Sequence, residues 1–169
     1  PGQIHGNTGF AHFGDFNLSE GDIANLIFQM GYDKFVNLVN NGVNINGILN
    51  TMKDNNFFNG HAIFVSPGGI VIGASGVLNV GALSLITPSQ NSYDKFVGNV
   101  QNFNNSQDIV NENLIALKSD TNTDKAITIN GKIISRGDVE IYGKNITVAK
   151  DNSKNNTAGI VAGVQGQDN

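Results

Sequence analysis

The sequence predicts an all-β fold of the solenoid type, in which successive windings of the chain pair with one another. Residues 60–87, GHAIFVSPGGIVIGASGVLNVGALSLIT, hold four short apolar runs. Val, Ile, Leu and Phe dominate these runs, and such side chains suit pleated, half-buried strands. Strands of three to five residues are not stable as isolated hairpins. Each is therefore expected to stack on the next winding, because neighbouring repeats of a solenoid bury one another's apolar face.

The four runs are separated by segments rich in turn-forming residues. The runs are His61–Val65, Ile70–Ile72, Val77–Val80 and Ala82–Ile86, and the segments between them are SPGG (66–69), GASG (73–76) and Gly81. Pro67 fixes φ for a turn, and the glycines supply the positive φ that tight corners need. The pattern therefore predicts four short strands joined by sharp corners.

This central stretch resembles the two-partner secretion domain, the filamentous-haemagglutinin-type N-terminal domain of large bacterial exoproteins. The Asn-Pro-Asn-Gly-Ile motif of that family corresponds to SPGGI (66–70), which keeps the Pro, the last Gly and the Ile but replaces both Asn residues. Upstream, FNLSEGDIANLIFQ (16–29) and FVNLVNNGVNINGIL (35–49) fall in the family's order. The high-molecular-weight adhesin branch is the most similar, because the second family motif, Asn-Pro-Asn-Leu, is missing. The resemblance covers residues 10–87 well and the remainder only in general character.

The resemblance implies a right-handed parallel β-helix with N-terminal capping strands and extra-helical hairpin or loop excursions. Residues 1–169 would form one domain at the front of a larger secreted adhesin or toxin. The periplasmic domains of an outer-membrane transporter of the TpsB type would bind it. The chain would then pass to the cell surface or extracellular space of a Gram-negative bacterium, where the domain would nucleate folding of a downstream β-helix.

Two segments are expected to serve transporter recognition or correct formation of the windings. They comprise Phe16, Asn17, Leu18, Ser66, Pro67, Gly68, Gly69 and Ile70. The alternative for both is a purely structural role, as a core strand and a turn.

Composition limits the possible partners. The chain has 169 residues, which suits one domain, and its net charge is −4 with 14% charged residues. Long basic patches are absent, so nucleic acid is not an expected partner. There is no cysteine and no apolar run of the roughly 18 residues that a membrane helix needs. We expect a monomer with no integral membrane segment and no cofactor.

Other segments are less regular. Residues 1–11 are expected to form an irregular start or a capping strand. Ile23, Leu26 and Met30 recur at helical spacing, yet the matching family segment is a set of strands, so we expect a strand at Ile23–Gln29 with a helix as the alternative. Residues 33–40 suit a short helix or a strand, and residues 52–59 a loop or an extra hairpin. The pattern loosens over residues 88–118, which suit an excursion from the windings, with room for a short helix around Tyr93–Asn99.

Apolar and polar residues alternate again from residue 126 onward. Ile127 alternates with Thr128, Val139 with Glu140, and Ile146 with Thr147. This period of two predicts strands with one buried and one wet face.

No catalytic or metal-binding constellation stands out. The three histidines lack zinc spacing, and no Ser-His-Asp set can be argued. DTNTD (120–124) starts like a calcium loop, but Lys125 replaces the loop's Gly and Gly131 its distal Glu, so no metal is expected. Arg136-Gly137-Asp138 spells the tripeptide that integrins read, although a glycine at a corner between strands also has a backbone reason.

Two rival functions remain beside the secretion role. One is a host-surface or glycan-binding adhesin module. The other is a polysaccharide-acting β-helix enzyme, which would carry clustered carboxylates or basic residues on one face of stacked strands. The acidic residues here lie mostly in expected loops, so we expect no enzymatic activity.

Overall fold

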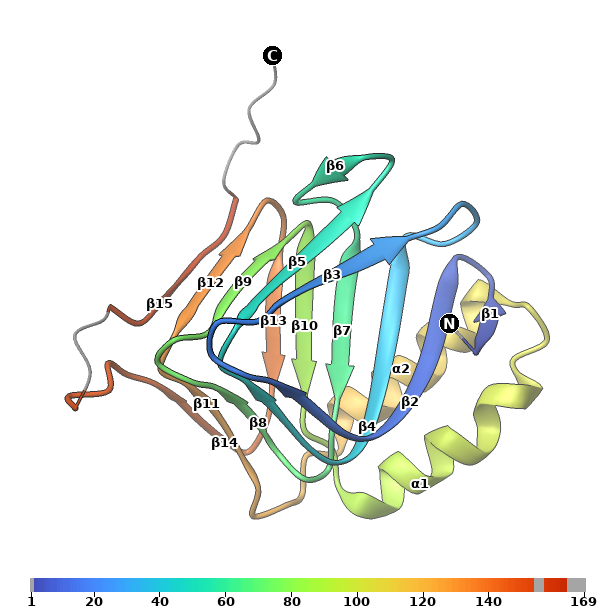
Figure 1. Ribbon diagram of the computed structural model, residues 1–169. Coiled ribbons are helices and arrows are strands. Elements are labelled where there is room, and N and C mark those ends of the chain that lie inside the picture. Colours follow the sequence, from blue (N-terminus) through green and yellow to red (C-terminus); the bar gives the residue numbers. More distant parts are fainter. Residues whose placement is uncertain (1, 154–156, 164–169) are drawn as a thin grey trace.

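The protein consists of two sheets of mainly parallel strands, with two helices packed against one of them (Figure 1). A computed structural model describes residues 2–153 and 157–163. Residues 1, 154–156 and 164–169 of the expected single domain lie outside the described residues. Sheet A has nine strands and is curled into a half-barrel, whereas sheet B has six strands and is flat.

The chain passes repeatedly between the two sheets. Sheet A contains β1 (Gln3–His5), β2 (Thr8–Leu18), β4 (Lys34–Ile45), β7 (His61–Val65), β8 (Ile70–Ile72), β10 (Ala82–Ile86), β11 (Ala126–Ile129), β13 (Val139–Tyr142) and β14 (Asn145–Val148). Sheet B contains β3 (Ile23–Phe28), β5 (Ile48–Lys53), β6 (Asn56–Phe57), β9 (Val77–Val80), β12 (Lys132–Ser135) and β15 (Gly159–Val161). The helices are α1 (Gln90–Asn99), the 3-10 turn η1 (Val100–Asn102) and α2 (Gln107–Ser119).

Sheet A curls because its long strand β4 has different neighbours along its length. Residues Lys34–Leu38 of β4 pair with β7, whereas Val43–Ile45 pair with β8. The adjoining strand β2 shifts register against β4 between Phe13 and Asp15. Such a bulge bends a strand and increases its local twist. The bend brings the second part of sheet A round to enclose a core with sheet B.

Strand β7 is buried on both faces, and the two faces belong to different cores. Ala62 and Phe64 point into the cluster enclosed by the sheets, with Leu83 and Ile127 among its other members. Ile63 and Val65 point the opposite way, into a cluster covered by the helices. Because side chains of a strand alternate between its faces, the unbroken apolar run 61–65 suits a strand between two apolar layers.

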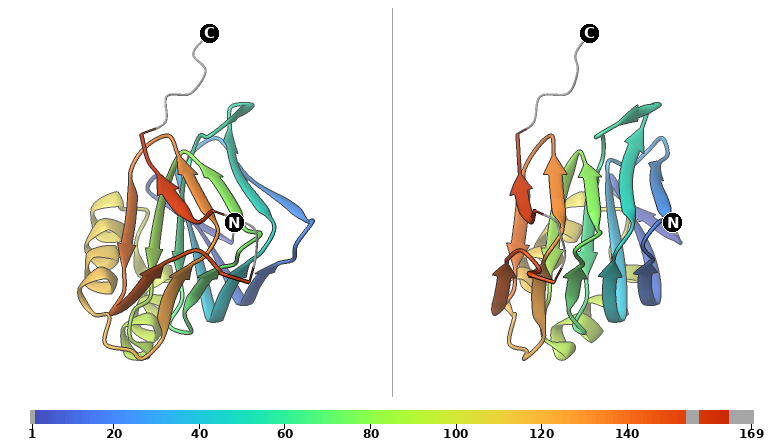
Figure 2. Two further views of the ribbon diagram at one scale, coloured as in Figure 1. Left: turned by 90° about the vertical axis from the view of Figure 1, so that its left-hand side faces the viewer. Right: turned by 60° about the vertical axis from the view of Figure 1, so that its left-hand side comes forward.

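The predicted all-β, right-handed parallel β-helix is wrong, because residues 90–119 form helices and the fold is of mixed α/β type. Ser89 caps α1 by accepting a hydrogen bond from the Ser92 amide at 3.1 Å, and Ser106 caps α2 by accepting one from the Ile109 amide at 3.3 Å. Apolar side chains recur along one face of α2, and the helices cover sheet A on the side of β4, β7 and β10 (Figure 2). Neither helix of the described part is long and apolar enough to cross a bilayer.

Several local predictions are confirmed. The strands β7, β8, β9 and β10 have the predicted bounds, and β3 is a strand and not a helix. Of the alternatives for residues 88–118, the short helix around Tyr93–Asn99 is found, as part of α1. The segment 52–59 forms an extra hairpin, in which Met52 pairs with Phe57. Of the two alternatives for residues 1–11, an irregular start or a strand, the structure has a strand, because β1 pairs antiparallel with β2. The alternation at Ile146–Thr147 correctly predicted a strand, which is β14. The expected buried face is wrong, because Ile146 and Val148 are 44% and 46% exposed.

Candidate functional site

Residues from both segments predicted to act in recognition line one hollow on the outer side of sheet A. Asn17 of β2 lies there together with Gly68 and Gly69 of the turn before β8. The hollow has a volume of about 330 Å³ and is also lined by Asn41 and Asn44. The structure therefore brings together two segments that are far apart in the sequence.

The apolar members of the predicted set are part of the core instead. Phe16 packs its ring edge-on against Phe64, with 5.1 Å between the ring centroids. Leu18 packs against the same cluster, and Ile70 is fully buried in it. These three side chains pack into the core and stabilise the fold.

The turn at 66–69 is held by its own hydrogen bonds. Ser66 is fully buried, and its Oγ accepts a hydrogen bond from the Gly68 amide at 3.2 Å. The Ser66 amide donates to the carbonyl of Ile86 at 3.0 Å, and the carbonyl of Gly69 accepts from Val43 at 3.0 Å. Pro67 is buried beside them. Both ends of the turn are thereby tied to neighbouring strands.

Gly68 has no room for a side chain. A Cβ on Gly68 would overlap the backbone carbonyl of Asn41. Gly69 has φ +100°, a conformation that favours glycine. The close approach of the turn to β4 therefore requires glycine at position 68.

The hollow is polar but carries little charge. Three amides line it, from Asn17, Asn41 and Asn44, and Asp15 is its single carboxylate. Each amide offers both donor and acceptor atoms. Asn41 uses its Oδ1 to accept a hydrogen bond from Asn40 at 2.9 Å. The hollow is suited to hydrogen bonding with main-chain or amide groups more than to binding an ion.

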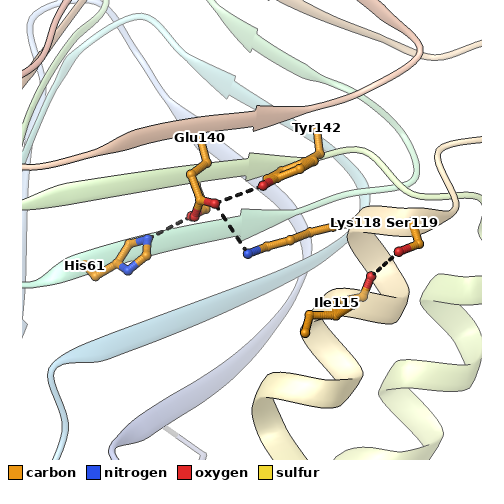
Figure 3. A network of polar contacts seen from close by, with 7 residues as sticks. His61, Ile115, Lys118, Ser119, Glu140 and Tyr142 are labelled. Carbon is orange, nitrogen blue, oxygen red and sulfur yellow. Dashed lines mark hydrogen bonds and ion pairs between the residues drawn. The ribbon is translucent and has the colours of Figure 1, made fainter.

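A polar network joins sheet A to helix α2 (Figure 3). His61 Nε2 lies 2.8 Å from Ser84 Oγ, which donates to Glu140 Oε1 at 3.0 Å. Tyr142 Oη donates to Glu140 Oε2 at 2.9 Å, and Lys118 Nζ lies 3.6 Å from the same oxygen. The chain of contacts crosses β7, β10 and β13 and ends on α2.

The surroundings of this network shift its pKa values. Burial, helped by the charge of Lys34, lowers the pKa of His61 to about 4. Burial opposes ionisation of Glu140, but the hydrogen bonds from Tyr142 and Ser84 outweigh it and lower the pKa of Glu140. Glu140 is therefore ionised and His61 neutral at pH 7.

The network lacks the geometry of a nucleophilic triad. Ser84 gives its only proton to Glu140, so His61 must carry its own proton on Nε2 and donate to Ser84. A catalytic serine needs the reverse, a histidine that accepts the hydroxyl proton. Ser84 is also 1% exposed. The arrangement connects neighbouring strands and α2. It could not be recognised as a motif in the sequence, because its residues come from four separate elements.

The backbone of Arg136-Gly137-Asp138 is hydrogen-bonded to the segment that runs from the end of β9 into β10. The Arg136 amide donates to Val80 at 3.0 Å, and the Gly137 amide donates to Gly81 at 2.7 Å. The carbonyl of Asp138 accepts from Leu83 at 3.0 Å. The backbone therefore continues the strand pairing, while the Arg136 side chain is exposed.

Asp120, the first residue of the calcium-like segment, serves the helices. Its Oδ2 accepts hydrogen bonds from the hydroxyls of Ser89 and Ser92, both at 2.6 Å. It thus connects the C-terminal end of α2 to the N-terminal end of α1. No group of three metal-ligating side chains occurs among residues 2–153 and 157–163.

Comparison of the chain with protein-family models, with curated proteins and with solved structures finds no match.

Proposed function

We propose that this chain is the secretion-recognition domain of a large secreted adhesin or toxin, bound by the periplasmic domains of an outer-membrane transporter. The observation that carries the proposal is the shared hollow of Asn17, Gly68 and Gly69. The sequence resemblance selected these residues, and they line one surface although Asn17 lies in β2 and the two glycines lie in the turn before β8.

The chemistry of the hollow suits an extended segment of a partner. Asn17 and Asn44 are exposed, and their amides can both donate and accept hydrogen bonds. An extended peptide presents alternating main-chain donors and acceptors to such a surface. We propose that a strand of the periplasmic domains lies across β2 and β4 at this hollow.

A second part of the proposal concerns folding of the exported protein. In the described part of the chain, β13 pairs only with β10, β14 with β11 and β15 with β12, so each has a free edge. Ile146, Val148 and Val161 are exposed on these strands. Added parallel strands would satisfy the free main-chain groups and shield these side chains from water. We propose that later segments of the exoprotein pair here.

The recognition proposal is tested by binding of the purified chain to the periplasmic domains of the transporter encoded beside its gene. The double variant Asn17→Ala/Asn44→Ala removes two exposed amides of the hollow without disturbing the core. The control is Gln29→Ala, which removes an exposed amide beyond β3 in sheet B. We expect binding to weaken about tenfold or more in the double variant, since each lost hydrogen bond costs about 0.5–1.5 kcal/mol.

Unchanged binding of the double variant would refute recognition at this hollow. Circular dichroism of each variant establishes that the fold is kept. Secretion of a reporter fused to the chain, in cells that make the transporter, gives a second measurement of the same effect.

A further inference from the structure

A second hollow lies where the strands of one side of sheet A begin. Its volume is about 410 Å³, within the range of about 300–1,000 Å³ that small-molecule sites occupy. It crosses the starts of β4, β7 and β10 and the segment that leads into β13. Lys34, Phe58, His61 and Arg136 line it, with Asp33 as the single carboxylate.

Two cations face this hollow. In the described part of the chain, neither the ammonium group of Lys34 nor the guanidinium group of Arg136 forms an ion pair or a side-chain hydrogen bond. His61, between them along the sheet, is neutral because burial lowers its pKa to about 4. The hollow therefore carries a net positive charge on a chain whose overall charge is −4.

The two cations lie at opposite ends of the hollow. β4 and β13 are separated by three steps between neighbouring strands, through β7 and β10. At about 4.8 Å a step, their backbones are roughly 14 Å apart. Long Lys and Arg side chains reach into this space from either end. A ligand with acidic groups repeated along its length can contact both.

Phe58 adds an aromatic ring to the rim. It has φ +56°, in the left-handed region, where a bulky residue is a rare exception. Holding an ordinary residue there costs on the order of 1–3 kcal/mol, and such positions are concentrated at binding sites. The ring is half-buried at the hollow and is not part of the main cores.

The floor of the hollow offers few free main-chain groups. The carbonyl of Gly60 accepts a hydrogen bond from Ala82 at 3.2 Å, and that of Gly81 accepts from Gly137 at 2.7 Å. The carbonyl of Asp33 accepts from His61 at 2.9 Å. A peptide could not add here as a further strand, because these groups are already paired. A ligand must be recognised by the side chains.

From these observations we propose that the hollow binds an acidic oligosaccharide. The carboxylates of successive sugar acids pair with Lys34 and Arg136, and the guanidinium group can hold a carboxylate through two hydrogen bonds. The apolar face of one pyranose ring packs on Phe58. This binding activity is independent of the proposed recognition by a transporter and uses a different surface of sheet A.

The test measures binding of a galacturonic acid hexamer to the full chain by calorimetry, with a neutral glucose hexamer and a glutamate hexamer as comparison ligands. We expect the acidic sugar to bind, the neutral sugar not to bind, and the peptide to bind at least tenfold more weakly. Arg136→Gln and Lys34→Gln should each weaken binding of the acidic sugar about tenfold. The matched control, Lys132→Gln, removes an exposed cation from β12 outside the hollow and should change nothing.

The variant Phe58→Gly distinguishes the contribution of the aromatic ring to binding from that of the two cations. Glycine accepts a positive φ readily, so this variant keeps the hairpin and removes only the aromatic face. We expect it to weaken binding of the acidic sugar severalfold and to leave binding of the glutamate hexamer unchanged. Absence of binding by the acidic sugar would overturn the proposal, as would equal binding by Arg136→Gln or by Phe58→Gly. Equal affinity for sugar and peptide would also overturn it, in favour of a site for acidic peptides.

Discussion

Gly68 lies so close to Asn41 that a Cβ on the glycine would overlap the carbonyl oxygen of Asn41. The contact joins the turn before β8 to the bend of β4 through backbone atoms alone. Asn41 lies between the parts of β4 that pair with β7 and β8, and main-chain atoms held on both sides in this way cannot move aside as a flexible side chain does. The position therefore accepts only glycine, and the turn and the curl of sheet A depend on each other.

We expect Gly68→Ala to lower the free energy of unfolding by about 1–3 kcal/mol, the usual cost of overpacking. Urea denaturation of the two proteins measures this difference. Gly98→Ala is the control, because Gly98 lies in α1 with nothing within 4 Å of an added Cβ. Since alanine is the better helix former, this control should gain about 0.5–1 kcal/mol. Equal stability of wild type and Gly68→Ala would contradict the close contact.

Truncation of two neighbouring residues of α2 should change stability by very different amounts. Leu114 is 5% exposed and packs against sheet A, whereas Ile115 is 60% exposed. Leu114→Ala should destabilise the protein by about 2–5 kcal/mol, since it leaves a cavity under the helix. Ile115→Ala should change stability by no more than about 0.5 kcal/mol. Similar losses in the two variants, measured by thermal unfolding, would mean that α2 does not dock as described.

The strands at 61–86 could be predicted from the sequence because local signals were sufficient there. Each run of β-branched or aromatic residues ends at a Pro or Gly that the turn requires. β3 was ambiguous because Ile23 and Leu26 also have helical spacing. Its pairing with β5, where Ile23 lies opposite Ile48, decides the conformation, and no local pattern reports that pairing.

Helix α2 was missed although its signals were present. Ser106 is an N-cap residue, and Val110, Leu114 and Leu117 repeat at helical spacing. The many Asn residues between them obscured the pattern. At the candidate site, the resemblance pointed to Asn17 and Gly68, but the linkage of His61 with Ser84 and Glu140 depends on register between separate strands.

Asp120 should make stability depend on pH in the acid range. Hydrogen bonds from Ser89 and Ser92 lower its pKa below the ordinary value of 3.8. The ionised carboxylate therefore stabilises the folded state above that value, and the contribution is lost as the pH falls through the folded-state pKa. We expect Asp120→Asn to be less stable than wild type at pH 7 and closer to it at pH 3, as measured by urea unfolding.

The control for this comparison is Asp124→Asn, which changes an exposed carboxylate in the following loop. It should remain near wild type at both pH values. A gap between wild type and Asp120→Asn that stays constant from pH 7 to pH 3 would show that the ionised form of Asp120 has no special role.

His61 should lower stability as the solution becomes acidic, and over a different range. Its pKa is 6.5 without perturbation and about 4 in the folded protein, because burial and the nearby charge of Lys34 disfavour the protonated ring. Between these values the unfolded chain binds a proton that the folded chain does not, so stability falls as the pH falls from 6.5 to 4. At about 1.4 kcal/mol for each pH unit, the full loss is roughly 3 kcal/mol.

His61→Gln removes this titration and retains a side chain that can donate to Ser84. Between pH 7 and pH 4.5 we expect the wild type to lose about 2 kcal/mol more stability than the variant. The effect of Asp120, whose pKa is set by Ser89 and Ser92, is common to both proteins and cancels in the comparison. His12→Gln, at an exposed position of β2, should follow the wild type. If His61→Gln lost as much stability as the wild type between pH 7 and pH 4.5, folding would not lower the pKa of His61. His61 would then not be held neutral between Lys34 and Arg136.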